Sequence, residues 1–251
     1  MKIQLLISTQ NKNFDWCKSK FGDFYCSIVN QVDSNLLLND IDYLKSYKEK
    51  GLSKSRNRSL QNASADICVI CDDDIKVLPD YEKKIKNAYK ALPDADIITF
   101  QIITPENKPY KKYAKYIKKH NRYSILKVSS IEISFKLSSI KSNKIQFDER
   151  FGLGSIYKGG EENIFLKDAL DMGLNIYYYP EPIVIHPDES SNKLINNDFF
   201  HVKGAVLKRL YGKKGIFIST LFFLFQLRKI KDYTKIYKYS KIFISGWNSI
   251  K

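Results

Sequence analysis

The chain has 251 residues, 43% of them hydrophobic, and a formal net charge of +15. This length suits one sizeable core with an appendage. The charge is uneven, because residues 201–251 hold twelve Lys and Arg against one acid, a net +11, which leaves +4 for the first 200 residues. The basic character therefore belongs to the C-terminal segment and not to the body of the protein.

The N-terminus and the cysteines predict a cytosolic protein. The apolar run in residues 1–9 is too short for a signal peptide, and no small-residue cleavage site follows it. Cys17, Cys26, Cys68 and Cys71 are expected to be free thiols in a reducing compartment. Cys68 and Cys71 lie three apart on a predicted strand and should face opposite sides, so we expect buried apolar residues and no metal or redox pair.

The beginning of the chain has the pattern that opens a β-α-β unit. Residues 2–8 and 23–33 predict two strands, and residues 14–20 predict a helix between them. The polar residues that end the second strand either hold a base or ribose or simply form a turn. They are Asn30, Gln31 and Asp33.

A short basic helix that runs to about Asn62 is predicted after Gly51. Ser53 or Ser55 is expected to cap it. Its first turns carry cations, which are mildly unfavourable at a helix N-terminus: Lys54, Arg56 and Arg58. A bound phosphate would gain from the free N–H groups and the arginines, and a solvated basic face is the plain structural alternative.

Residues 65–74 form an apolar run that ends in three carboxylates, Asp72, Asp73 and Asp74. Three adjacent like charges at a strand end are unfavourable because of repulsion and desolvation. A bound Mn²⁺ or Mg²⁺ would relieve both, since these cations take carboxylate oxygens together with substrate phosphates. Open α/β sheets hold ligands at this edge, so we predict a metal–diphosphate site. An acidic turn after an edge strand is the alternative.

The middle of the chain continues the alternation of helix and strand. A helix is predicted over residues 79–92 and strands over 95–103 and 129–135, the last with Glu132 as a polar contact. Between these strands, residues 108–127 hold eight Lys and Arg with interleaved tyrosines and no acid. Such a segment suits single-stranded nucleic acid, sugar rings or anionic head groups, and equally a solvated loop.

A second acidic pair follows a glycine loop. Gly159 and Gly160 precede Glu161 and Glu162, which begin a helix predicted to end before Gly173. Two glutamates in the first turn are favourable next to the positive end of the helix dipole. In the functional alternative, the glycines let a substrate approach the backbone and one glutamate acts as a general base.

The body is predicted to end with a strand over residues 174–179, a rigid turn at 180–182 and an extended run that finishes on His186. A lone histidine after an apolar run is usually structural. His186 nevertheless ends a strand, as the aspartates do, and is therefore a candidate metal ligand.

Residues 215–227 are the most apolar run in the chain, too short to span a bilayer, which needs about 20 residues. Cations flank the run on both sides: Lys208, Arg209, Lys213, Lys214, Arg228, Lys229 and Lys231. This pattern predicts an interfacial helix on an anionic membrane. A helix packed on the body or in a homodimer is the alternative.

Taken in order, these stretches resemble family 2 glycosyltransferases of the GT-A fold. Residues 51–57, Gly-Leu-Ser-Lys-Ser-Arg-Asn, resemble the G-L-S-x-A-R-N segment of that family, and residues 72–74 resemble its D-x-D motif. Residues 160–162 resemble its G-E-D acceptor motif, with a Glu where Asp is commoner. His186 falls where many such enzymes have a late metal-binding histidine, so the resemblance covers about residues 1–190.

The resemblance implies an α/β fold: a GT-A (Rossmann-like) mixed, mostly parallel sheet flanked by helices over residues 1–197, with a basic, aromatic helical extension over 198–251. It implies an inverting enzyme that moves a sugar from a nucleotide diphosphate sugar, expected to be a UDP-sugar, to a hydroxyl of a glycan or lipid-linked saccharide in surface polysaccharide synthesis. Mn²⁺ or Mg²⁺ would neutralise the leaving nucleoside diphosphate.

The same resemblance implies roles residue by residue. The donor contacts fall on Thr9, Asp33, Arg56, Asp72 and Asp73, and the metal ligands on Asp74, Asp72 and His186. Glu162, which matches the Asp of the motif, would deprotonate the acceptor hydroxyl, and Glu161 would hold an acceptor hydroxyl. The order of these two glutamates stays open. The acidic pair that usually ends the second strand is replaced by Asn30-Gln31, so the nucleoside contacts stay open too.

Two rival functions remain. A nucleotidyltransferase also places aspartates on a metal at strand ends, but does not need the Gly-Gly-Glu-Glu helix start. An RNA- or membrane-binding module without catalysis leaves the three aspartates unexplained, since acids near a polyanion are unfavourable. We therefore expect a nucleotide-sugar donor, a saccharide acceptor and an anionic membrane as partners, no nucleic acid, a homodimer as an open alternative, and a peripheral location at the inner face of the cell membrane.

Overall fold

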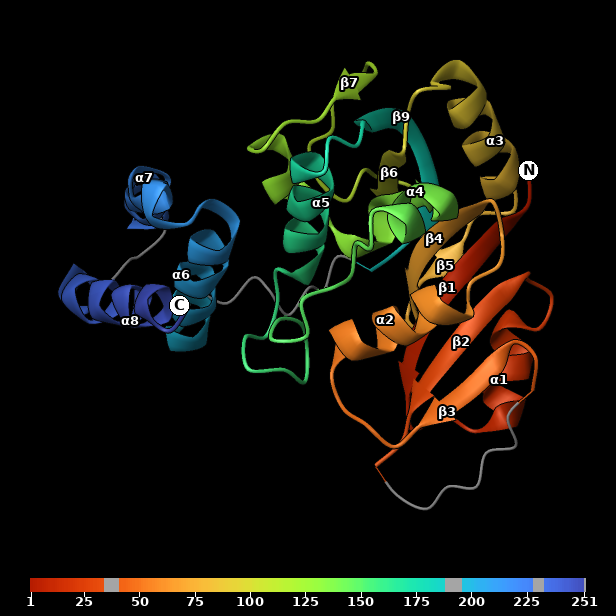
Figure 1. Ribbon diagram of the computed structural model, residues 1–251, viewed down its shortest axis with the longest axis horizontal. Helices are drawn as coiled ribbons and strands as arrows, with labels where there is room; N and C mark the ends of the chain where they lie inside the picture. Colours follow the sequence, from red (N-terminus) through yellow and green to blue (C-terminus); the bar gives the residue numbers. More distant parts are fainter. Residues whose placement is uncertain (34–40, 188–195, 228–232, 251) are drawn as a thin grey trace.

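The computed structural model describes residues 1–33, 41–187, 196–227 and 233–250 (Figure 1). Its strands are β1 (Ile3–Gln10), β2 (Cys26–Gln31), β3 (Leu44–Tyr47), β4 (Ile67–Asp72), β5 (Lys76–Val77), β6 (Ile97–Ile103), β7 (Lys118–Lys119), β8 (Ile133–Lys136) and β9 (Ile176–Ile185). They form one sheet in the order β3-β2-β1-β4-β8-β6-β9-β5, with β7 on β9. Because β8 is antiparallel to both β4 and β6, the strands β3, β2, β1, β4, β6 and β9 all point the same way.

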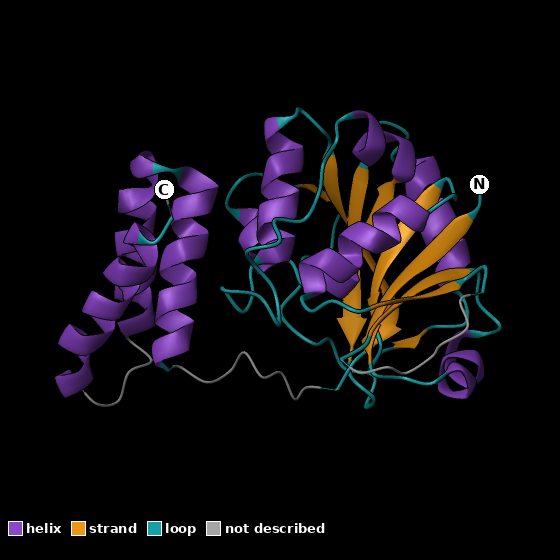
Figure 2. Ribbon diagram, turned by 60° about the horizontal axis from the view of Figure 1, so that its bottom comes forward, coloured by secondary structure: helices purple, strands orange, loops and turns teal. Residues whose placement is uncertain are grey.

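Helices cover both faces of this sheet, as Figure 2 shows. They are α1 (Phe14–Phe21), α2 (Leu52–Asn62), α3 (Tyr81–Ala91), α4 (Leu137–Ser142), α5 (Glu161–Asp171), α6 (Asn197–Tyr211), α7 (Ile216–Leu227) and α8 (Ile236–Asn248). Side chains of α1 and α3 share one core cluster with the sheet, and those of α2, α4 and α5 share the other. The predicted α/β fold, a mixed and mostly parallel sheet flanked by helices, is confirmed.

Alternation along β4 decides which side chains enter which core. Val69 and Cys71 lie in the cluster with α1 and α3, whereas Cys68 and Ile70 lie in the opposite cluster. The two cysteines of the C-x-x-C pattern therefore face opposite sides, as the strand period requires. All four cysteines are buried and free.

Three local predictions differ from the structure. Helix α2 begins after Gly51 without a side-chain cap, because Ser53 and Ser55 lie inside the helix and bond to other elements. The expected turn at residues 180–182 is instead an irregular part of β9, which continues to Ile185 through register shifts against β6. Residues 130–132 form a 3₁₀ turn ahead of the short β8.

The C-terminal helices α6, α7 and α8 gather at one end of the molecule, beyond α5 (Figure 1). Helices α6 and α8 approach closely at two glycines: an added Cβ would lie 2.2 Å from the Phe243 carbonyl oxygen at Gly204 and 1.9 Å from the His201 carbonyl oxygen at Gly246. Among the described residues, no helix is long and apolar enough to cross a membrane. The predicted cations Arg228, Lys229 and Lys231 lie outside the described residues.

Arg209 anchors α6 to the body. Its Nε donates to Asp148 at 2.9 Å, and its Nη1 and Nη2 donate to both carboxylate oxygens of Asp168 at 3.0 and 2.8 Å. Burial raises the pKa of Asp148, but hydrogen bonds from Arg150 and Arg209 lower it by more. The net effect is a pKa below the ordinary value. Helix α6 therefore packs on the body through the ion pairs of Arg209 with two aspartates and through a shared apolar cluster.

Candidate active site

Parallel pairing brings several polar strand ends to one edge of the sheet. Ser8 of β1 pairs in register with Asp72 of β4, and Gln10 pairs with Gln31 of β2. The carboxyl end of β9 reaches the same edge, where the short strand β5 pairs Lys76 with Ile185. The turn that carries Asp72, Asp73 and Asp74 therefore lies beside His186, the residue after β9.

The start of α2 connects the parts of this edge. Ser55 Oγ donates to Ser8 Oγ at 2.9 Å, and Ser53 Oγ donates at 2.6 Å to a backbone carbonyl in the loop before α5. Asn57 exchanges two hydrogen bonds with the backbone of Phe147, at 2.8 and 3.0 Å. The predicted phosphate role of this segment is untested, but its polar side chains each hold another segment of the site.

Arg56 is the central contact. It is 3% exposed, and it joins the strand-end carboxylate to the helix-start carboxylate: Nη2 lies 2.9 Å from Asp72 Oδ1, and Nη1 lies 2.8 Å from Glu161 Oε1. Burial lowers the pKa of Arg56, but the facing charges of Asp72 and Glu161 more than offset this, so its pKa is raised. Both Nη atoms are thus directed at protein carboxylates, whereas the sequence predicted a contact to the donor.

The two glutamates of α5 have different surroundings. Glu161 is 5% exposed, and its Oε2 is buried without a hydrogen-bond partner. Glu162 is half-buried and is not held by Arg56. Desolvation by the surrounding protein, followed by the charge of Glu161, raises the pKa of Glu162 to about 7, against opposing effects of Lys203 and Arg56. A carboxyl group with a pKa near neutral can take up and release a proton at the pH of the cell.

The glycine loop before α5 has two separate functions. Gly160 adopts φ +85°, and an added Cβ would lie 2.5 Å from Val206 Cγ2 on α6. Gly160 is therefore required by the docking of α6. Gly159 has no atom within 4 Å of an added Cβ, so the open side of the loop lies there.

Asp73 and Asp74 contact other segments of the chain. Thr9 Oγ1 donates to Asp73 Oδ2 at 2.6 Å, and Lys20 Nζ donates to the Asp73 carbonyl. Asp74 is largely exposed, and its Oδ2 lies 3.5 Å from His186 Nε2. Thr9 and Lys20 therefore hold the turn at Asp73, while the exposed carboxylate of Asp74 lies beside the His186 ring.

Two of the three polar residues at the end of the second strand use their side chains to hydrogen-bond backbone groups. Asn30 exchanges two hydrogen bonds with the backbone of Lys12, and Gln31 exchanges two with the backbone of Gly51. These contacts favour their structural alternative over a base contact. Asp33 is exposed and accepts hydrogen bonds from the side chains of Gln10 and Asn11 at 3.2 and 3.0 Å.

The side chains of Asp74 and His186 are of the kinds that could bind a hard divalent ion together with a diphosphate. Among the described residues, no three His, Cys, Asp or Glu side chains gather as a complete metal site. His186 Nδ1 donates to the Pro187 carbonyl at 2.6 Å, which leaves Nε2 as an acceptor facing Asp74. Two protein ligands suffice where phosphate oxygens supply the others. Asp72 accepts instead from Arg56 and, at 3.4 Å, from Ser130.

Sequence reasoning missed Lys203 of α6, whose positive charge lowers the pKa of Glu162. No local signal marks it, because its place depends on how α6 docks. Glu132, a predicted polar contact, is buried against Lys111 and Tyr113, with distances of 2.6 and 2.8 Å. Part of the basic segment 108–127 is therefore held to the body.

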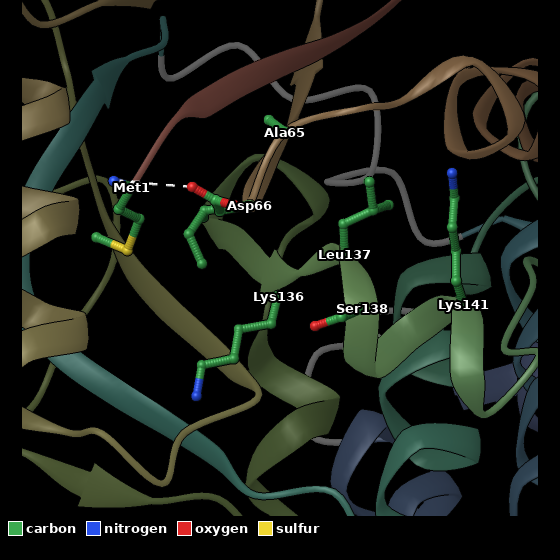
Figure 3. Close-up of a pocket in the computed structure, with 8 residues that line it drawn as sticks. Met1, Ala65, Asp66, Lys136, Leu137, Ser138 and Lys141 are labelled. Carbon is green, nitrogen blue, oxygen red and sulfur yellow. Dashed lines mark ion pairs between the residues drawn. The ribbon is translucent and has the colours of Figure 1, made fainter.

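A surface hollow at the opposite edge of the sheet is not part of this site. Its lining includes Asp66, which precedes β4, and two lysines of the β8–α4 region (Figure 3). Lys136 and Lys141 donate to the backbone carbonyls of Pro93 and Ala63 at 2.8 and 2.9 Å. Since its cations already have protein partners, the hollow offers little to a ligand.

The model of the family described as glycosyl transferase family 2 matches residues 28–152, which include the segment around Arg56 and the three aspartates. The chain belongs to this family. It is therefore a glycosyltransferase, and the non-catalytic alternative is wrong. Glu161, Glu162 and His186 lie beyond the matched residues. No curated protein matches the sequence.

Solved structures of TarS from S. aureus share the fold. The crystal structure of TarS 1-349 in complex with UDP-GlcNAc matches with a TM-score of 0.62 and 14% identity, over 98% of this chain and 79% of that one. The crystal structure of TarS 1-349 matches with a TM-score of 0.57 and 14% identity, over 84% of this chain and 66% of that one. Full TarS gives 0.57 and 14%, over 94% of this chain and 45% of its own. At this identity the likeness concerns the fold.

Proposed function

We propose that this glycosyltransferase moves a sugar from a nucleotide diphosphate sugar, specifically a UDP-sugar, to a hydroxyl of a glycan or lipid-linked saccharide in surface polysaccharide synthesis. The observation that carries the proposal is the Arg56 bridge, which joins the strand-end carboxylate Asp72 to the helix-start carboxylate Glu161. One buried cation thus holds a donor side and an acceptor side together. The TarS complexes with UDP and UDP-GlcNAc support the choice of donor.

On the donor side, Asp74 and His186 would hold Mn²⁺ or Mg²⁺, with Asp72 close by. When bound, the ion neutralises the diphosphate that leaves as the glycosidic bond breaks. Thr9 fixes Asp73 and so the shape of the turn. Asp33 keeps a carboxylate exposed at the end of β2, where it can accept hydrogen bonds from the nucleoside.

On the acceptor side, Glu162 is the base. The acceptor hydroxyl gives its proton to the Glu162 carboxylate while its oxygen attacks the anomeric carbon from the face opposite the diphosphate, which inverts the configuration. A pKa raised to about 7 suits this step. Glu161 is held by Arg56, and its Oε2 is buried without a hydrogen-bond partner.

A screen of nucleotide sugars by thermal shift, with and without Mn²⁺, tests the donor. A ligand at 100 times its dissociation constant adds about 2.7 kcal/mol, which is roughly 5–10 °C for a chain of this size. We expect a uridine diphosphate sugar to raise Tm when Mn²⁺ is present and much less when EDTA replaces it. If nucleoside triphosphates stabilise the protein and no nucleotide sugar does, a nucleotidyltransferase is the better reading.

A further inference from the structure

Helix α7 buries two polar side chains and leaves a row of apolar side chains exposed. Ser219 and Gln226 are buried, with 0% and 6% exposure, whereas Phe217, Leu221 and Phe225 are 79%, 68% and 56% exposed. The outward residues recur every four positions and so share one helix face. Other apolar side chains of α7 pack on the core cluster of α6 and α8, so the helix is apolar on its packed face and on its exposed face. A surface helix in water is normally polar on its exposed face.

The exposed face of α7 offers no charge and little polarity to its surroundings. Its hydroxyl, on Thr220, donates to the helix's own Ile216 carbonyl at 2.9 Å. A hydroxyl satisfied in this way is compatible with an apolar environment. We define the α7 apolar face as Phe217, Leu221, Leu224 and Phe225, each more than half exposed.

The segments next to α7 in the chain are rich in exposed lysines. Lys213 and Lys214 are exposed directly before α7, and Lys238 and Lys241 are exposed on α8. Residues 201–251 carry a net +11. A second copy of the chain would bring two such charged segments together, which is unfavourable, whereas anionic phosphates would be attracted.

We infer that the α7 apolar face lies in the headgroup–acyl boundary of an anionic lipid bilayer, with the neighbouring lysines on lipid phosphates. At 12 residues the helix is about 18 Å long, shorter than the roughly 30 Å hydrocarbon core, so it lies in the plane of the surface. This inference deepens the acceptor side of the proposed function. The membrane contact itself is argued from α7, and only its use in presenting a lipid-linked acceptor rests on the proposed function.

The contact between α6 and the glycine loop links this surface to the site. Val206 of α6 packs directly on Gly160, which precedes Glu161 and Glu162, and α6 leads into α7. Binding of α7 to a bilayer would therefore hold the catalytic base near the membrane. A lipid-linked acceptor would be presented there.

Vesicle flotation of the full chain, without nucleotide sugar, tests the inference. Vesicles of phosphatidylcholine with phosphatidylglycerol are compared with pure phosphatidylcholine. We expect binding to the anionic vesicles only, reduced by high salt and reduced about tenfold or more by the double variant Phe217→Ser/Leu221→Ser. The matched control Met172→Ser removes an apolar side chain that is 55% exposed on the body and should float as the parent does. Lys213→Gln/Lys214→Gln should weaken binding to anionic vesicles.

Unchanged flotation of the double variant, with its melting temperature preserved, would overturn the inference. So would a parent protein that ignores both vesicles and forms a dimer that the double variant loses, because the face would then join two copies. Neither result bears on donor binding, which the thermal-shift screen measures separately.

Discussion

Replacing Glu162 by Gln should raise stability while it removes catalysis. The folded protein holds the pKa of Glu162 at about 7, against an ordinary value of 4.5. Between these values the unfolded chain has lost a proton that the folded chain retains, so the free energy of unfolding falls as pH rises through this window. The whole difference corresponds to about 3 kcal/mol, and partial exposure of the side chain reduces it to about 1–3 kcal/mol.

Glutamine removes this cost because it never ionises. At pH 8 we expect Glu162→Gln to melt roughly 3–10 °C above the parent protein, and at pH 4.5 we expect the two to melt together. Transfer at pH 8 should fall about 10²–10⁴-fold, the usual contribution of a general base. The parent's kcat/KM should rise with pH and level off above about 7, and the variant should show no such rise.

Differential scanning fluorimetry across pH, paired with release of the nucleoside diphosphate, measures both effects on the same preparations. Glu162→Asp, which restores the commoner residue of the family motif, is the matched control and should keep measurable transfer. Equal melting of Glu162→Gln and parent at pH 8, or a kcat/KM rise that survives in the variant, would refute the assignment of a raised pKa to a catalytic Glu162.

Two further predictions concern the bridge and the metal. Arg56→Met leaves the buried Glu161 carboxylate unpaired and should cost about 3–5 kcal/mol in urea unfolding, and adding Glu161→Gln should recover part of it; an unchanged unfolding midpoint in Arg56→Met would contradict the bridge. Asp74→Ala should weaken binding of Mn²⁺ with the nucleotide about tenfold or more by titration calorimetry, with stability unchanged since Asp74 is largely exposed. Wild-type metal affinity in that variant would remove Asp74 from the metal site.

Much of the fold could be predicted from local pattern. The strand before Asp72, the helix that begins at Glu161 and its end before Gly173 all follow from apolar periodicity and terminal residues. Errors came where side-chain chemistry has two local meanings. Ser53 and Ser55 resemble caps, yet each bonds to a distant segment from inside α2.

The sequence by itself determined that carboxylates gather at strand and helix ends and that a basic, apolar tail follows, because charge and periodicity are properties of neighbours in the chain. Only the tertiary structure decided that Arg56 joins Asp72 to Glu161, which lies 105 positions after Arg56. Likewise, only packing decided which side chains of α7 are exposed and that Lys203 lies near Glu162. Such contacts depend on where separate elements dock, and that is fixed by burial and shape across the whole core.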